Sequence, residues 1–139
     1  MTAMDERVLR ILEYHKITEL LASFAVSELG KAACDGVRPP KHYHEVCRII
    51  DETQSAEYFL YQTGGSPVEP FSDVQTSLMR CKIGSTLSMG ELLLCAGLLR
   101  SSRLCRERLG AFSQGAILRP MALGLFSDKP VEQEITACI

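Results

Sequence analysis

The residues best suited to chemistry in this sequence are His42, His44 and Cys47, which lie within six positions of one another. His44 and Cys47 are three residues apart, so both side chains would share one face of a helix. With Cys34 they could bind zinc, because imidazoles and thiolates are its usual ligands. Structural zinc sites usually have two closely spaced ligand pairs, however, and only one pair is present. We therefore interpret this stretch as the polar start of a helix and expect no metal site.

Gly30 and Lys31 are the nearest approach to a nucleotide-binding loop. A Walker A loop requires a glycine five residues before such a pair and a Ser or Thr after it, to bind phosphate and magnesium. Ala25 and Ala32 occupy those positions. No histidine lies in a glycine-rich turn with a nucleophile. We expect no ATP site, no cofactor, no catalytic residue and no enzyme activity in this chain.

A local run of arginines is the best candidate for a binding surface. On a helix, Arg100, Arg103 and Arg106 would lie broadly on one face, with Arg108 beside them and Glu107 as the only acidic residue among them. Such a face could contact phosphate or an acidic partner. The alternative, which we favour, is a solvated helix end whose cations complement the helix dipole. The net charge of −2 also argues that nucleic acid binding by this chain alone is weak or absent.

The elements that would position these residues are helices. Aromatic residues make up 6% of the 139 residues and Trp is absent, so Leu and Ala must do most of the packing, which favours helices over strands. Apolar stripes before and after residues 13–16 point in nearly opposite directions, which predicts a break there. The predicted helices cover approximately residues 5–12, 16–25, 42–62, 74–82, 89–109, 120–126 and 130–139, and residues 27–34 add another helical turn or two after the second helix.

Several helix ends have specific sequence markers. Asp5 is expected to cap the first helix, and Ser88 and Glu91 match the capping box that opens a helix. Gly84 is placed to close the helix before it, and Pro130 suits a first helical position. The helix after Ser88 is apolar on almost every side up to Leu99, as in the central helix of a bundle. We predict a single all-α domain over residues 1–139, an irregular bundle of about six to seven helices.

Cysteine usage and hydropathy indicate a cytoplasmic protein. Most of the six cysteines lie in apolar helical stretches, which is typical of reduced, packed thiols. The first residues lack the apolar segment of a signal peptide. The longest apolar stretch, Leu92 to Leu99, is too short to cross a membrane.

The order of motifs along the chain resembles the MutS family, and within it the second bacterial branch, MutS-two. The similarity begins at YHKITELLASFAVSELGKAA (14–33) and resumes at ETQSAEYFL (52–60). It continues through GGSP (64–67) and DVQTSLMRCKIGSTLSMGELL (73–93), and ends with EQEITACI (132–139). These matches are spread in order over nearly the whole chain.

The resemblance implies the N-terminal region of a longer protein, related to the core and lever part of MutS. Its full-length members are homodimeric ATPases that bind ATP and magnesium, carry a clamp and commonly an Smr nuclease domain, and act on DNA or on ribosomes. We therefore predict a non-catalytic structural and coupling module of a protein involved in DNA repair and recombination control. The alternatives are a free-standing helical adaptor for protein partners, or a metal or thiol sensor built on Cys34, His42, His44 and Cys47.

Overall fold

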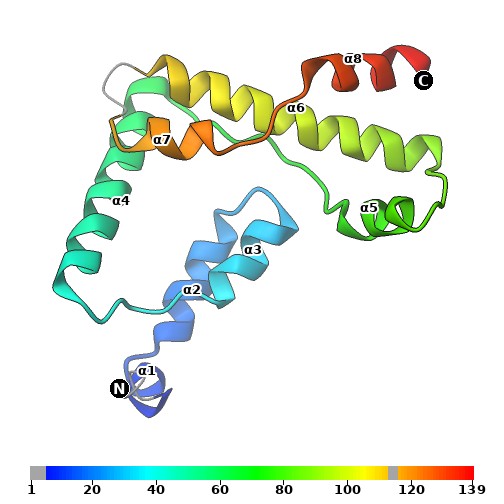
Figure 1. Cartoon of the computed structure of the whole chain (residues 1–139). Coiled ribbons are helices and arrows are strands. Elements are labelled where there is room, and N and C mark those ends of the chain that lie inside the picture. Colours follow the sequence, from blue (N-terminus) through cyan, green and yellow to red (C-terminus); the bar gives the residue numbers. More distant parts are fainter. Residues whose placement is uncertain (1–5, 113–115) are drawn as a thin grey trace. The chain divides into compact units, whose positions relative to one another are not determined.

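The computed structural model describes residues 6–112 and 116–139, and every regular element in these two ranges is a helix (Figure 1). The prediction of an all-α fold is confirmed, with eight helices in these ranges rather than six to seven. In chain order they are α1 (Glu6–Ile11), α2 (Tyr14–Ser23), α3 (Glu28–Asp35), α4 (Tyr43–Thr63), α5 (Gln75–Lys82), α6 (Met89–Ala111), α7 (Leu118–Leu123) and α8 (Lys129–Cys138). No helix in these ranges is long and apolar enough to cross a membrane.

The chain divides into two compact units, Met1–Cys47 and Arg48–Ile139. The first unit contains α1, α2 and α3 with the start of α4, and the second contains the rest of α4 and the remaining helices. Whether these two units form the single domain expected over residues 1–139 stays a prediction. The predicted cap at Asp5 lies outside the described residues.

In the first unit, the break predicted near residues 13–16 is present at Leu12 and Glu13, and α2 begins directly after it at Tyr14. Glu13 adopts a left-handed backbone conformation with φ of 52°, which ends the regular hydrogen bonding between α1 and α2. Its carboxylate accepts a hydrogen bond from Lys16 Nζ at 2.6 Å. The second helix then stops at Ser23, so the prediction that it continues through Ala25 was wrong by two residues. Ser27 caps α3 by accepting a hydrogen bond from the Gly30 amide at 3.1 Å.

The apolar stripe of α2 is exposed. Ile17, Leu20 and Leu21 are exposed, and Phe24, just after the helix, is 75% exposed. The buried position of this helix is Thr18, whose hydroxyl donates to the His15 carbonyl at 3.0 Å. The periodicity therefore identified an amphipathic helix correctly, while the neighbours α1 and α3 leave its apolar face uncovered.

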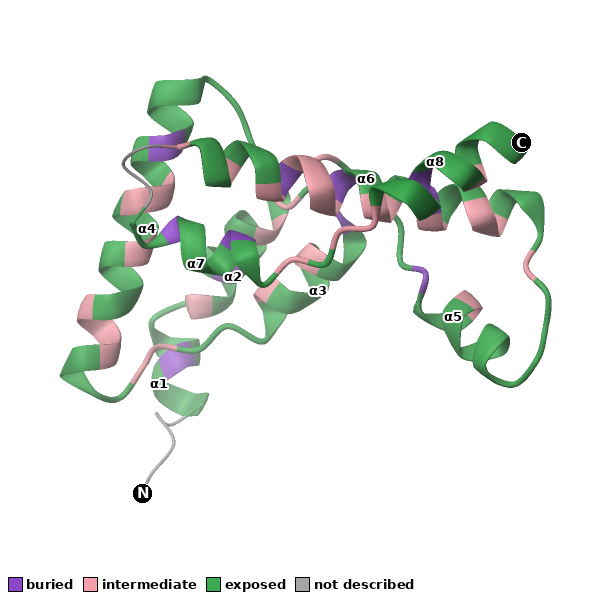
Figure 2. Ribbon diagram, turned by 45° about the horizontal axis from the view of Figure 1, so that its top comes forward, coloured by how far each residue is buried: buried purple, intermediate pink, exposed green. Residues whose placement is uncertain are grey.

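In the second unit, α6 is the long helix against which α7 and α8 pack. Figure 1 shows α7 beside the C-terminal half of α6 and α8 beside its N-terminal half, and these two helix pairs make the main contacts of the unit. The buried positions are coloured in Figure 2 and include Phe59 on α4, Ala96 and Cys105 on α6, and Ala122 on α7. The Phe59 ring meets the Phe112 ring edge to face at 5.1 Å between centroids.

The expectation that α6 is the central helix of a bundle holds only in part. Ala96 is 5% exposed, but Leu93 and Leu94 are 46% and 45% exposed. A helix of this composition has apolar groups on all sides, and α7 and α8 cover only some of them. The remaining apolar surface of α6 is therefore available for contacts beyond this unit's own helices.

The predicted ends of α5, α6 and α8 agree with the structure to within two residues. Gly84 adopts a φ of 87° after α5, as its predicted helix-ending role requires. The helix predicted over residues 120–126 lies earlier in the chain than expected: α7 begins at Leu118 and ends before Gly124. Pro130 is the second residue of α8 and not the first. Its missing amide hydrogen costs nothing at either position, because the first four amides of a helix have no acceptor within the helix. Asp128 caps the helix by accepting a hydrogen bond from the Val131 amide. The predicted helix stop at residues 113–115 lies outside the described residues.

The capping box at the start of α6 is present, and it also joins α5 to α6. The Ser88 hydroxyl accepts from the Glu91 amide, and the Glu91 carboxylate accepts from the Ser88 amide at 2.9 Å. The same carboxylate accepts hydrogen bonds from Ser77 at 2.9 Å and from Arg80 at 2.7 Å, both on α5. The Ser88 amide, the Ser88 and Ser77 hydroxyls and the Arg80 guanidinium together lower the pKa of Glu91 from 4.5 to about 2.

This lowered pKa predicts a pH-dependent contribution to stability. Because the folded state favours the ionised carboxylate, Glu91 stabilises the protein fully above pH 4.5 and loses that contribution as the pH falls through about 2. We expect Glu91→Gln to have a lower urea midpoint than the wild type at pH 6, and the difference to shrink as the pH falls towards 2. Urea unfolding of both proteins, followed by circular dichroism at several pH values between 6 and 2, measures the difference between the two midpoints. A difference that stays constant with pH would contradict the assignment.

Candidate functional site

The arginine run of α6 forms a network of intramolecular contacts. Arg103 makes a two-pronged ion pair with Glu132 of α8, with both nitrogen–oxygen distances at 2.8 Å. The two side chains are only 17% and 12% exposed, and a third contact joins Arg103 to Glu107 at 3.3 Å. These hydrogen bonds raise the pKa of Arg103 and lower the pKa of Glu132, so both groups stay charged. Arg103 therefore holds α8 against α6.

Two further arginines of α6 contact the loops beside it. Arg106 donates to the Leu125 carbonyl at 3.3 Å, in the segment that leads from α7 to α8. Arg108 donates to the Glu69 carboxylate at 2.8 Å and to the Pro67 carbonyl at 3.2 Å. Both contacts fix irregular segments, which have no helical hydrogen bonds of their own, to the surface of α6.

Arg100 differs from the other three arginines by its exposure. Its side chain is 63% exposed, and its Nε lies 3.8 Å from the second carboxylate oxygen of Glu69. This separation is too long for a hydrogen bond, and an exposed pair of this kind contributes little to stability. Of the three arginines that the sequence indicates as phosphate or partner contacts, Arg100 has a cation accessible to a ligand, while Arg103 and Arg106 contact α8 and the segment before it. A contact of these three arginines with phosphate or with a partner protein stays a prediction.

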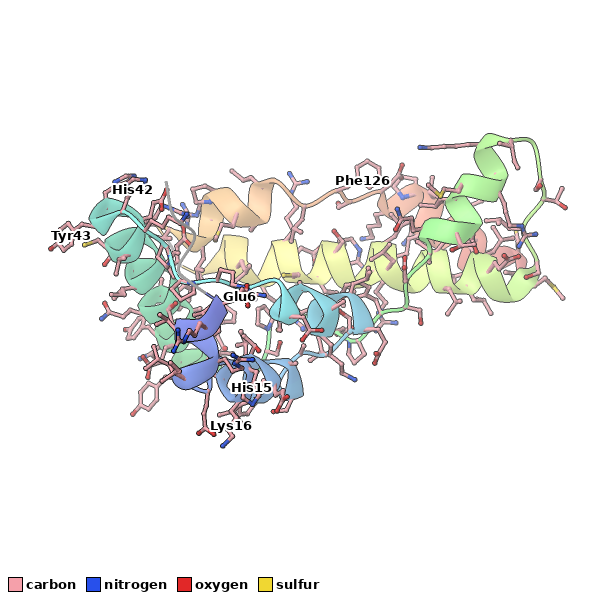
Figure 3. The ribbon with its side chains drawn as sticks, turned by 90° about the horizontal axis from the view of Figure 1, so that it is seen from below. Glu6, His15, Lys16, His42, Tyr43 and Phe126 are labelled. Carbon is pink, nitrogen blue, oxygen red and sulfur yellow. The ribbon has the colours of Figure 1, made fainter. Side chains whose placement is uncertain are left out.

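The histidines and cysteine of the candidate metal stretch lie at the start of α4. Figure 3 shows His42 at this end of the helix, and the His42 and His44 rings are stacked with centroids 5.7 Å apart. Cys34 and Cys47 are partly buried free thiols. Within residues 6–112 and 116–139, no three His, Cys, Asp or Glu side chains converge on a point where they could hold a metal ion. The stacked rings belong to the polar helix start that the sequence predicts.

Gly30 and Lys31 lie in the first turn of α3, and their contacts are local. Lys31 pairs with Glu28 at 2.7 Å on the same helix. A β-carbon at position 30 would lie 3.2 Å from the Ser27 hydroxyl oxygen and 3.3 Å from the Ala25 side chain. The glycine therefore makes room for the cap that starts α3, which explains its presence by packing.

Glu69 and Glu132 are partners of arginines that the sequence did not single out, and Glu91 was identified only as a capping residue. Each accepts from arginines that lie 11 to 39 positions away, and no local spacing rule connects residues at such separations. Glu132 follows the cap residue Asp128 and has the pattern of an ordinary acidic first turn. An excess of arginines over acids on α6 was the one sequence feature that could have suggested acidic partners elsewhere in the chain.

The fold and the contacts define a helical protein in which arginines of α6 attach α8 and the neighbouring loops to this helix. In sequence, the chain is 30% identical to Endonuclease MutS2 of Clostridioides difficile over 136 residues, which is 95% of this chain. It is 36% identical over 104 residues to the protein of the same name from Clostridium beijerinckii, and 39% identical over 100 residues to that from Acetivibrio thermocellus, covering 75% and 72% of the chain. No protein-family model matches.

The chain is thus related in sequence to the MutS2 proteins, and the resemblance found in its motifs is confirmed. The match spans less than a fifth of the length of these relatives, 17% for the Clostridioides difficile protein and 13% for the other two. The similarity concerns one helical segment of a much larger protein.

Proposed function

We propose that this chain is a structural and coupling module from the N-terminal region of a MutS2-type protein. The observation that carries the proposal is the sequence match over 95% of the chain to a protein several times its length. The module has no catalytic role of its own in this proposal. ATP and magnesium binding, homodimer formation, the nuclease activity, and contact with DNA or ribosomes belong to the cytoplasmic full-length protein.

The distribution of apolar surface supports this proposal. Among the described residues, no large side chain is less than 2% exposed, while whole helical stripes such as Ile17, Leu20 and Phe24 are uncovered. Extended exposed apolar surface is typical of segments that pack against further protein. The same surface also favours the second candidate, a free-standing helical adaptor that recruits a protein partner.

A chimera tests the proposed module. The matched 136-residue segment of Clostridioides difficile MutS2 is replaced by this chain, and a second variant has the segment deleted. We expect the chimera to recover the soluble yield, thermal midpoint and DNA binding that the deletion loses, because the transplanted helices restore the missing packing surfaces. A chimera no better than the deletion variant in all three measurements would contradict the proposal.

The isolated chain gives a complementary prediction. We expect no ATP hydrolysis, and at most weak DNA or RNA binding that falls steeply between 50 and about 200 mM salt, because the net charge is −2 and Arg103, Arg106 and Arg108 of α6 are engaged in internal contacts. A fluorescence anisotropy titration with a labelled duplex checks the binding, with the salt concentration as the variable. Tight binding that persists at high salt would favour a free-standing nucleic-acid-binding protein.

A further inference from the structure

The groove between α6 and α8 has the features of a docking site. It has a volume of about 490 Å³ and lies within the second unit, where the two helices run side by side (Figure 2). The apolar residues that line it are three small ones and one leucine, namely Leu93, Ala96, Gly97 and Ala137. The polar residues that line it are Arg100, Glu132, Gln133 and Thr136.

Gly97 in the middle of α6 is not explained by the packing of the chain itself. A glycine inside a helix costs about 0.5–1 kcal/mol relative to alanine, because the unfolded backbone is freer. A β-carbon at this position would have no atom within 4 Å, so no described neighbour requires the missing side chain. Leu93, one turn earlier on the same face, is 46% exposed. Glycine at this position therefore leaves open space at the groove, of the kind that permits close approach of another backbone.

Among the described residues that line the groove, Arg100 is the positively charged side chain. Glu132 is neutralised by its two contacts with Arg103, and Lys129 and Arg100 also lie close enough to lower its pKa. Glu69 is bound by Arg108 at 2.8 Å, which leaves Arg100 with a 3.8 Å separation and a 63% exposed side chain. An incoming carboxylate could therefore form a shorter ion pair with Arg100 than Glu69 does.

We propose that this groove binds an acidic amphipathic helix of a partner protein. An apolar side chain of that helix enters the space above Gly97, and a carboxylate one turn away on the same helix pairs with Arg100. A nucleic acid is a poorer fit, because phosphate backbones are bound by several free cations and the other arginines of α6 are already engaged. The apolar lining residues likewise match an apolar side chain better than a phosphate. This proposal does not depend on the chain's relation to MutS2.

The test uses the whole 139-residue chain and a designed 18-residue helical peptide of leucine, alanine and glutamate, with a matched peptide in which lysine replaces every glutamate. Binding is mapped by amide chemical shifts in ¹⁵N NMR spectra. We expect the acidic peptide to shift the amides around Ala96 and Ala137, and the basic peptide to leave them unchanged. A 20-base-pair DNA duplex is titrated in parallel.

Variants of the chain separate this groove from its other exposed apolar surfaces. Arg100→Gln should weaken the acidic peptide about tenfold, which corresponds to about 1.4 kcal/mol for a lost charged contact. Gly97→Leu, which fills the groove, should remove the groove shifts, while Gly110→Leu, at another open glycine of α6, should preserve them. Arg119→Gln, an exposed arginine outside the groove, is the charge control. Equal peptide affinity in the wild type and Arg100→Gln, or duplex DNA shifting the groove amides in place of the peptide, would overturn the proposal.

Discussion

Replacing Phe59 with alanine is expected to lower the free energy of unfolding by about 3–4 kcal/mol, the largest loss for any single truncation in the second unit. Phe59 is 3% exposed, and it is the largest side chain in the buried core. Its ring meets the Phe112 ring edge to face at 5.1 Å between centroids. The substitution removes a buried aromatic group and leaves a cavity where the end of α4 meets the end of α6. Urea unfolding, followed by circular dichroism, measures the loss.

Tyr61→Ala provides the matched control, because Tyr61 lies two residues further along the same helix and is 83% exposed. It changes helix propensity and aromatic content in a similar way without opening a cavity, so we expect a change within about 0.5 kcal/mol. Similar losses for the two substitutions would show that Phe59 is not part of a packed core. The contact between α4 and α6 would then contribute no stability.

The second large effect is expected from reversing the charge at Arg103. In Arg103→Glu, the new carboxylate faces Glu132 and Glu107, which the wild-type guanidinium binds at 2.8 and 3.3 Å. The new carboxylate repels the largely buried Glu132 and, more weakly, the exposed Glu107, and α8 loses its polar attachment to α6. We expect a marked drop in the thermal midpoint and a loss of hydrogen-exchange protection in α8 before the rest of the unit.

The double variant Arg103→Glu with Glu132→Arg distinguishes the ion pair from a general effect of charge. It restores opposite charges across the same two helices, so it should recover much of the lost thermal midpoint. Lys31→Glu, which breaks the exposed pair between Lys31 and Glu28 on α3, should change the midpoint little. If the double variant were as unstable as the single one, the attachment of α8 would depend on packing and not on this pair.

The Arg103 result also bears on the interpretation of the arginine run. Arginines gathered on one helix face suggested either a phosphate contact or a solvated helix end. The structure shows a third role, because these arginines attach α8 and two loops to α6. A substitution at Arg103 that weakens ligand binding could therefore act through the loss of α8. Arg100 can be altered with the least structural effect, since its side chain is the most exposed of the three candidates.

The helices themselves were determined by the sequence, because their signals are local. The capping box of Ser88 and Glu91, the left-handed Gly84 and the opposed stripes around Glu13 each involve residues within a few positions of one another. Backbone hydrogen bonds and caps act at this range, so spacing alone predicts where a helix begins and ends. The displaced α7 shows the limit of this approach, because its six residues carry too little periodic pattern to locate its start.

Tertiary structure decided which apolar faces are buried and which charges are paired. The stripe of α2 and the leucines of α6 have the periodicity of buried residues, yet neighbouring helices leave them exposed. Burial depends on what lies opposite a face, and periodicity describes only the face itself. The pairs of Arg103 with Glu132 and of Arg108 with Glu69 join residues 29 and 39 positions apart. Contacts of that separation form only when the chain folds back on itself, so the attachment of α8 and the groove beside it could be found only in three dimensions.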